Sequence, residues 1–460
     1  MNNEESDFKL PSRRYEVVEE GATPRRGSIA CEIGRNRNVS FSTEGLASYC
    51  FAPWEAVIFD ALLVAAAVEF CDREFRRPAQ SWGREFFLTV PVHDVDRWRN
   101  MKVLSPLVEA LEFLTGDRWH LRFKGRKTQE PSPAQGRFPF PANARWIVPF
   151  SNGLDSWSVA TLVEQQWGAG LLRVRLSPHT AGAGTRRAKE AFAVVPYNVR
   201  AGRHHLAETT VRSRGLKFAL ISGLAAYLAK VEDVIVAESG QGALGPVLVP
   251  VGQAYPDYRS HPQFMVRMER FLAALLNHKV HFRFPRIWNT KGETLREALS
   301  IRASTSWADT RSCWQSQRWV SVERKRRQCG ICAACLLRRL SVFSAGQIEP
   351  PTQYVWENLG ASTFEAGAAM SFVRHNHMFR RYAIAGTLHL DYIADLAGSA
   401  AHAGTVTRNS VLLSQALGIP VPVVEAQLMH MLRTHAQEWT EFVHALGKGS
   451  FVSHWAQATA

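Results

Sequence analysis

From residue 145 onward, short apolar runs alternate with longer amphipathic stretches. The apolar runs have the length and composition of buried strands, and they are RWIVPF (145–150), LLRVRL (171–176), AFAVVPYNV (191–199), VIVAES (234–239) and VHFRFP (280–285). Helical periodicity separates or follows them at 155–167, 213–230, 262–276 and from TKGE (290–293) onward. Strand–helix alternation of this kind predicts an α/β fold with a doubly wound parallel sheet covered on both faces.

The N-terminal part of the chain has a mixed pattern. We expect helices at 53–75 and 103–115, and strands at 84–92 and 118–126. Together they predict an α+β domain of unknown role within residues 1–130.

The remaining boundaries follow from composition. Residues 128–144 are rich in Pro, Gly, Ser and Ala and are interpreted as a linker. Residues 346–460 show helical stretches such as 423–446 and no strand-like alternation. We therefore expect a central α/β domain (145–345) followed by a helical C-terminal region (346–460).

The loop between the first central strand and its helix carries small and polar residues suited to a phosphate. They are Ser151, Asn152, Gly153, Leu154, Asp155 and Ser156. Loop amides and the positive end of the helix dipole attract anions, the serines can donate hydroxyls, and Asp155 can hold a Mg²⁺ bound to pyrophosphate. The alternative is a capped helix start with no ligand. No Gly-Lys-Ser/Thr follows, so the loop is not a Walker loop.

A cluster of cysteines lies late in the chain. Cys329, Cys332 and Cys335 form two overlapping C-x-x-C units, and Cys313 is the expected fourth ligand. The N-terminus lacks a secretory signal, so metal ligation is favoured over disulfides, and a closed Cys₄ shell predicts a structural Zn²⁺. The alternatives are free buried cysteines and an iron–sulfur cluster.

The formal net charge of +14 predicts an anionic partner. Nucleic acid is possible but is not favoured, because charge alone does not single it out. The basic residues Arg324, Lys325, Arg326 and Arg327 form either a solvated loop or an arm for an acidic partner. The most apolar stretch, 56–70, is too short and too charged to cross a bilayer, so we expect a cytoplasmic protein with no membrane contact.

The loop resembles the S-G-G-x-D-S signature of the pyrophosphate-loop ATPases (adenine nucleotide alpha hydrolase-like fold), which cleave ATP between the α and β phosphates. Asn152 replaces the first Gly of that signature, and Asn tolerates left-handed backbone angles. Four further matches resemble the QueC family of 7-cyano-7-deazaguanine synthases over 145–345. They are RSRGLKF (212–218), YPDYR (255–259), TKGE (290–293), and RSCW (311–314) followed by C-G-x-C-x-x-C and Arg338.

This resemblance implies ATP-dependent activation of the carboxylate of 7-carboxy-7-deazaguanine as an acyl-adenylate, which an amine then captures. It implies catalytic roles for Asp155 and Arg214, ATP, Mg²⁺ and Zn²⁺ as cofactors, and recognition of the guanine-like edge by Asp257. The alternative for Asp257 is a turn residue after Pro256.

Three departures distinguish the chain from the synthases: Tyr258 replaces a Cys, the segment after Cys313 is longer, and both ends carry extra residues. These features look more like the QueC-like proteins of anti-phage operons, such as the C component of the Qat system. That implies an amide product and an amine on a protein, with an acidic protein as the partner. The alternatives are a synthase that proceeds to the nitrile, a tRNA-modifying pyrophosphate-loop ATPase, and a zinc-containing nucleic-acid-binding module with a decayed ATP site.

Overall fold

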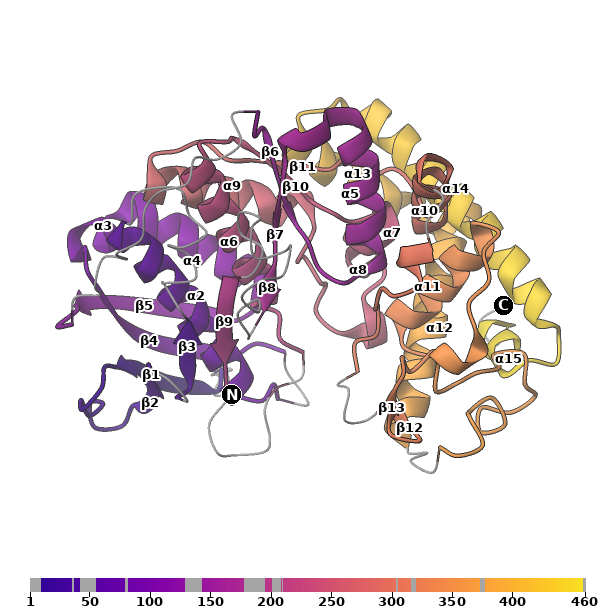
Figure 1. Cartoon of the computed structure of the whole chain (residues 1–460), viewed down its shortest axis with the longest axis horizontal. Helices are drawn as coiled ribbons and strands as arrows, with labels where there is room; N and C mark the ends of the chain where they lie inside the picture. The colour runs from indigo at the N-terminus through magenta and orange to yellow at the C-terminus, as the bar shows by residue number, and fades with distance from the viewer. Residues whose placement is uncertain are drawn as a thin grey trace, which may run out of the picture. The chain divides into compact units, whose positions relative to one another are not determined.

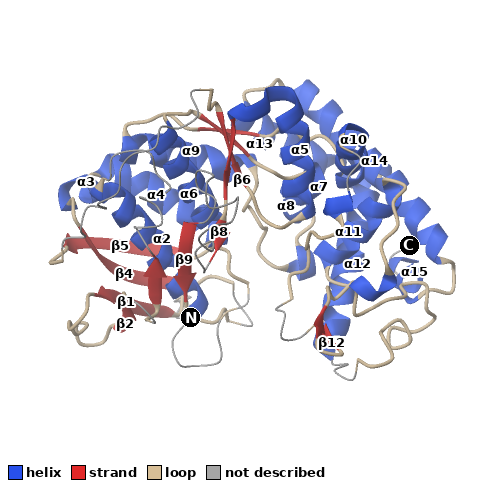
Figure 2. Ribbon diagram, in the orientation of Figure 1, coloured by secondary structure: helices blue, strands red, loops and turns tan. Residues whose placement is uncertain are grey.

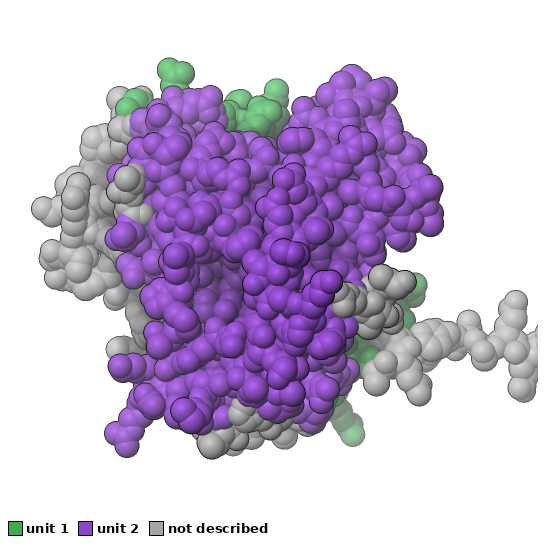
Figure 3. Space-filling view, turned by 90° about the vertical axis from the view of Figure 1, so that its right-hand side faces the viewer, with its two compact units in different colours: residues 1–149, 169–235, 264–283 green, residues 150–168, 236–263, 284–460 purple. Residues whose placement is uncertain are grey.

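The computed structural model describes residues 10–34, 37–41, 55–78, 82–128, 143–177, 195–200, 208, 210–302, 305–315, 320–372 and 377–457. The chain divides into two units, coloured in Figure 3. The first comprises residues 1–149, 169–235 and 264–283, and the second comprises 150–168, 236–263 and 284–460. Most of the expected linker, 129–142, lies outside the described residues. The three-domain division stays a prediction.

The first unit contains the expected parallel sheet. Its strands are β6 (Trp146–Pro149), β7 (Leu171–Val174), β10 (Asp233–Ile235) and β11 (His281–Arg283). Their order is β11-β10-β6-β7, and every neighbouring pair is parallel. The chain leaves β6 for β7 on one side and later adds β10 on the other, so the doubly wound α/β prediction is confirmed.

Two strands differ from their expected extents. VIVAES leaves the sheet after Ile235, because the Glu238 N–H donates to the Val236 carbonyl (2.9 Å) in a tight turn. The described part of the 191–199 run is β9 (Val195–Val199), which pairs in parallel with β8 (Leu176–Ser177) and antiparallel with β3 (Val39–Phe41). A single residue, Arg175, separates β7 from β8, so the chain passes directly from one sheet into the next.

The N-terminal residues form a second four-stranded sheet within the first unit (Figure 1). Its strands, in the order β2-β1-β4-β5, are β2 (Ile29–Glu32), β1 (Ser12–Val18), β4 (Glu85–Val92) and β5 (Arg118–Gly125). All its pairs are parallel, an arrangement that the α+β expectation did not specify. The helices of this unit are α2 (Ala56–Glu74), α3 (Val95–Arg99), α4 (Met101–Thr115), α6 (Arg214–Ala229) and most of α9 (Pro262–Leu276).

Helix α2 packs on α6, and polar contacts reinforce this packing. Asp72 accepts the Ser213 N–H (2.9 Å) just before α6 begins, and Glu69 pairs with Lys217 (2.8 Å). The N-terminal residues are therefore joined to the helix that carries Arg214.

The second unit is mainly helical (Figure 2). Its helices are α5 (Leu154–Trp167), α7 (Gly240–Ala243), α8 (Gly245–Leu248), α10 (Lys291–Ile301), α11 (Ala333–Ser344), α12 (His377–Gly398), α13 (Ala403–Leu417), α14 (Val421–Leu446) and α15 (Phe451–Gln457). A short hairpin is formed by β12 (Ser321–Val322) and β13 (Lys325–Arg326). The helical C-terminal region is confirmed, and its core gathers around buried aromatic residues such as Trp356, Phe364 and Phe379.

No single helix among the described residues is long and apolar enough to cross a membrane. The helical segments Ala400–Leu417 and Val421–Leu446 together are long and apolar enough for a membrane span, but the chain bends by 117° between them.

Candidate nucleotide site and cysteine centre

The loop at residues 151–156 follows β6 after a single residue, Phe150, and β6 is the strand at which the order of the sheet reverses. The hydroxyls of Ser151 and Ser156 lie 2.8 Å apart, and the Ser151 hydroxyl also accepts the Gly153 N–H (3.1 Å). The Asn152 carbonyl accepts the Arg311 N–H (2.6 Å). Four described non-glycine residues have a positive φ and Asn152 is not one of them, so replacing the signature Gly by Asn brings no backbone strain.

Asp155, in the first turn of α5, lies beside a buried cation. Its Oδ2 is 2.5 Å from the Nζ of Lys291, whose side chain is only 7% exposed. Its Oδ1 accepts the Ser239 hydroxyl (3.3 Å). Ser239 follows β10 and Lys291 follows β11, so the three residues come from segments that follow neighbouring parallel strands.

Of this group, sequence reasoning predicted a role only for Asp155. It missed Ser239, the nearby Glu238 and Lys291, although Lys291 lies in the TKGE match. Burial and the nearby carboxylates of Asp155 and Asp257 raise the pKa of Glu238 to about 8, although Lys291 and Arg259 oppose the shift. A cation placed between two neighbouring carboxyl groups stabilises their ionised forms, because it offsets the repulsion between the two negative charges. In nucleotide sites Mg²⁺ is bound by one or two carboxylates together with phosphate oxygens. Asp155 and Glu238 therefore fit Mg²⁺. The available signal was an acidic residue near the end of the expected buried strand VIVAES (234–239).

Asp257 lies close enough to Glu238 to raise its pKa, but the carboxylate of Asp257 contacts a residue near it in the chain, Arg259. Its carboxylate is 2.7 Å from Nη2 of Arg259 and accepts the Arg259 N–H (3.2 Å). This is the geometry of the turn residue that was the alternative to base recognition. The recognition role stays a prediction.

Arg214 lies at the start of α6 in the first unit, with its guanidinium 5.6 Å from the Phe218 ring centroid. The preceding residue, Ser213, is held by Asp72 (2.9 Å), as described above. The catalytic role of Arg214 stays a prediction.

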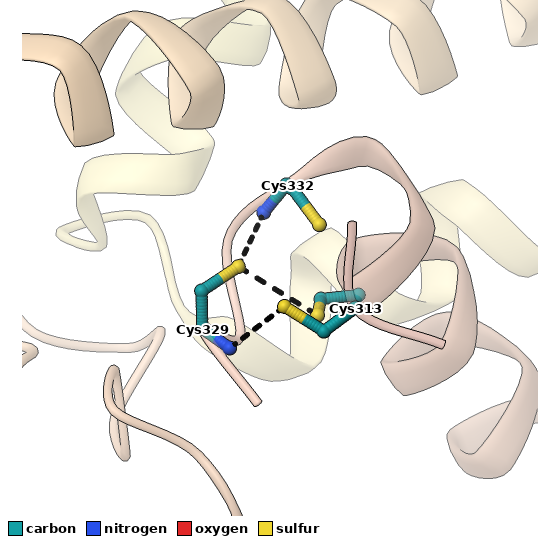
Figure 4. Close-up of side chains that lie close together, drawn as sticks. Cys313, Cys329 and Cys332 are labelled. Carbon is teal, nitrogen blue, oxygen red and sulfur yellow. Dashed lines mark hydrogen bonds between the residues drawn. The ribbon is translucent and has the colours of Figure 1, made fainter. Parts of the chain in front are cut away.

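The four expected cysteines meet in one cluster in the second unit, and Figure 4 labels three of them, Cys313, Cys329 and Cys332. Their sulfur atoms all lie within 4.8 Å of one another, and those of Cys329 and Cys335 are 3.7 Å apart. Tetrahedral Zn–S bonds of about 2.3 Å place sulfurs about 3.8 Å apart, so the cluster fits Zn²⁺. Gly330 has a φ of +86°, and a Cβ there would meet the Trp356 carbonyl at 2.9 Å, which explains a Gly at that position.

Backbone N–H groups point at two of these sulfurs. Cys313 Sγ accepts from the N–H groups of Cys329 (3.2 Å) and Gln315 (3.4 Å), and Cys329 Sγ accepts from that of Cys332 (3.3 Å). Hydrogen bonds from the other three cysteines hold the pKa of Cys313 below its usual value, whereas burial raises the pKa of Cys329 and Cys335. A site that stabilises thiolate at one position and excludes water at the others suits a structural metal.

The basic stretch before this cluster divides into two parts. Arg324, Lys325 and Arg326 are exposed at the tip of the β12–β13 hairpin. Arg327 instead pairs with Glu357 (2.5 Å) and donates to the Tyr354 carbonyl (3.1 Å). Three of the four charges are therefore available to a partner, and the fourth supports the cysteine-bearing segment.

Comparison with known families found one match. Residues 189–345 match the family model described as queuosine biosynthesis protein QueC. The comparisons with curated proteins and with solved structures found no match. The matched segment contains Asp257, Lys291 and the four cysteines, and it begins after the loop at 151–156. This part of the chain is thus similar to the QueC family, which indicates an ATP-utilising pyrophosphate-loop enzyme related to 7-cyano-7-deazaguanine synthase.

Proposed function

We propose that the chain is an ATP-dependent ligase that activates a carboxylate of the 7-carboxy-7-deazaguanine type as an acyl-adenylate and transfers it to an amine. The observation that carries this proposal is the grouping of Asp155, Glu238 and Lys291 after neighbouring strands of the sheet, with the S-N-G-L-D-S loop leading into Asp155.

These residues suit the chemistry of adenylation. The carboxylate oxygen attacks the α-phosphorus of ATP, the bond to the β-phosphate oxygen breaks, and pyrophosphate leaves with the bonding electrons. Lys291 can stabilise the charge on the departing pyrophosphate. Asp155 and Glu238 would hold Mg²⁺, which supplies further neutralisation of the phosphate oxygens. The ion pair with Asp155 already holds the ammonium group of Lys291 in place, so this side chain needs to move little when pyrophosphate departs.

The amine then attacks the acyl carbon, AMP leaves, and the amine loses a proton to give an amide. We propose that this amine belongs to an acidic protein. Support comes from the exposed hairpin charges at Arg324, Lys325 and Arg326, and from residues on both sides of the matched segment. An acyl-adenylate is lost to water unless the amine is held beside it, and a protein amine needs a docking surface for that. A role in anti-phage defence is part of the same proposal.

ATP–pyrophosphate exchange with a panel of carboxylates tests the adenylation. Exchange that requires 7-carboxy-7-deazaguanine or a close analogue is the expected result. Incubation with ammonia then separates the amide-forming ligase from a synthase, because only the synthase accumulates the nitrile. If ATP does not bind in the presence of Mg²⁺, the proposal is wrong, and this result supports the alternative of a zinc-containing nucleic-acid-binding module.

A further inference from the structure

A run of buried hydrogen bonds joins the C-terminal region to Lys291, entirely within the second unit. The Lys291 N–H donates to Oε1 of Gln241 (2.7 Å), and Nε2 of Gln241 lies 2.7 Å from Nδ1 of His435. Nε2 of His435 lies 2.8 Å from the Leu390 carbonyl. Gln241 and His435 are 1% and 0% exposed, so water does not compete for these bonds.

The direction of every bond in this run is determined. Gln241 accepts at Oε1 from a backbone N–H, so its Nε2 faces His435 and donates. His435 must then accept at Nδ1 and carry its proton on Nε2, which donates to the Leu390 carbonyl. Burial lowers the pKa of His435 to about 4, which keeps the ring in this neutral form.

The local capping of α10 provides no hydrogen-bond acceptor for the backbone N–H of Lys291. Thr290 and Glu293 form a capping box, in which the Thr290 hydroxyl accepts the Glu293 N–H and the Glu293 carboxylate accepts the Thr290 N–H. Lys291 is the first helical residue, and its N–H is one of the donors that a helix cannot satisfy internally. Gln241 satisfies it, and His435 holds Gln241 in place.

A second residue of α14 meets the same helix start. Glu438 accepts the Thr290 hydroxyl (2.8 Å), and its carboxylate oxygen would lie 2.5 Å from a Cβ added to Gly292. The close approach of α14 therefore depends on the glycine beside Lys291. His435 and Glu438 are three residues apart and lie on one face of α14.

We propose that His435 and Glu438 are positioning residues, through which the C-terminal region sets the place of Lys291 opposite Asp155. This inference rests on the proposed function, in which Lys291 stabilises the departing pyrophosphate. Both residues lie beyond the matched segment 189–345, so it assigns a task to a region that the family comparison does not cover.

A matched pair of variants at one position tests the inference. His435→Asn keeps an acceptor where Nδ1 lies but removes Nε2, whereas His435→Gln keeps a donor near the Leu390 carbonyl but loses the acceptor for Gln241. Misplacement of a reacting group by about 1 Å can cost up to about 100-fold in rate. We expect His435→Gln to lower kcat/KM for ATP in the exchange reaction at least about tenfold. His435→Asn should recover most of that loss, and Gln437→Ala, an exposed change on α14, should match the wild type.

Melting temperatures measured on the same samples separate positioning from stability. Loss of activity in both His435 variants in proportion to their melting temperatures would overturn the inference, as would full activity in His435→Gln. Should His435→Gln fold poorly, Gln241→Met breaks the same run from the other side and must reproduce the loss. In a double-mutant cycle, the effects of Gln241→Met and His435→Gln should not add.

The failure of this inference is distinguishable from failure of the proposed function. Absence of exchange and of Mg²⁺–ATP binding in the wild type contradicts the proposed function. A wild type that binds and exchanges, together with an equally active His435→Gln, contradicts only the positioning role.

Discussion

The carboxylate of Asp155 and the ammonium group of Lys291 lie 2.5 Å apart, although 136 positions separate the two residues in the chain. Both side chains are largely buried, at 14% and 7% exposed. A buried pair of this kind is costly to break from one side, because the remaining charge is left uncompensated. Changes at Asp155 are therefore expected to affect both chemistry and stability.

Asp155→Asn should lower the rate of adenylation by about 100-fold or more, because it removes a proposed ligand of Mg²⁺ and the ion-pair partner of Lys291. The variant should remain folded with a reduced melting temperature, since Lys291 loses its partner. ATP–pyrophosphate exchange and circular dichroism check both parts. Exchange at the wild-type rate would show that the loop is not the nucleotide site.

Glu238 should release a proton when Mg²⁺–ATP binds. Because the pKa of Glu238 is raised to about 8, its carboxyl group is mostly protonated at pH 7, and a carboxylate must lose its proton to hold a metal. Calorimetry in buffers of different ionisation enthalpy should report about one proton released per ATP bound. Glu238→Gln should abolish this release, and an unchanged value in that variant would exclude Glu238 as the source.

Glu438 makes stability depend on pH in a defined window. Burial raises the pKa of Glu438 from 4.5 to about 7, so between these values the folded state holds a proton that the unfolded state has released. Its contribution to stability is therefore present at low pH and is lost as pH rises toward 7. At pH 8 we expect Glu438→Gln to be more stable than the wild type by up to about 3 kcal/mol.

The check is chemical denaturation of the wild type and Glu438→Gln across pH 5 to 8, in steps of about half a unit. The two stability curves should diverge as pH rises. Parallel curves would mean that the carboxyl group of Glu438 ionises normally in the folded protein.

Cys332→Ser should lose the structural metal and destabilise the second unit, since metal binding to a closed cysteine shell contributes directly to folding. Elemental analysis of the wild type should find one zinc per chain. Cys71→Ser, which changes a buried cysteine outside the cluster, should keep the full zinc content. Iron in the purified protein, or full zinc in Cys332→Ser, would contradict the assignment.

The exposed hairpin charges should matter for the acceptor and not for adenylation. The combined variant Arg324→Ala, Lys325→Ala and Arg326→Ala should slow transfer to an acidic protein partner by roughly tenfold at low salt, because rim charges act mainly on association. Arg327 is kept, since it pairs with Glu357. Mass spectrometry of the partner measures the adduct, and exchange measures adenylation.

A control with the same change in net charge replaces Arg380, Arg381 and Arg433, which are exposed elsewhere in the second unit. Equal slowing in both combined variants would indicate an effect of overall charge and not of the hairpin.

The sequence by itself determined the features that depend on near neighbours in the chain. Strand and helix positions such as 146–149 and 154–167 follow from hydrophobic periodicity, which reports the local backbone. The cysteine centre was predictable because Cys329, Cys332 and Cys335 lie within seven residues, so their spacing alone restricts their geometry.

Tertiary structure alone decided which distant residues share a site. Glu238 has no motif of its own, and its raised pKa arises from burial and from charges brought to it by folding. Gln241 and His435 are 194 positions apart, and they meet because α14 packs close to the start of α10. A hydrogen bond forms only when its two atoms are about 3 Å apart. A sequence pattern can therefore predict it only when the two residues are near each other in the chain. For residues far apart in the chain, the packing of the core decides whether they meet.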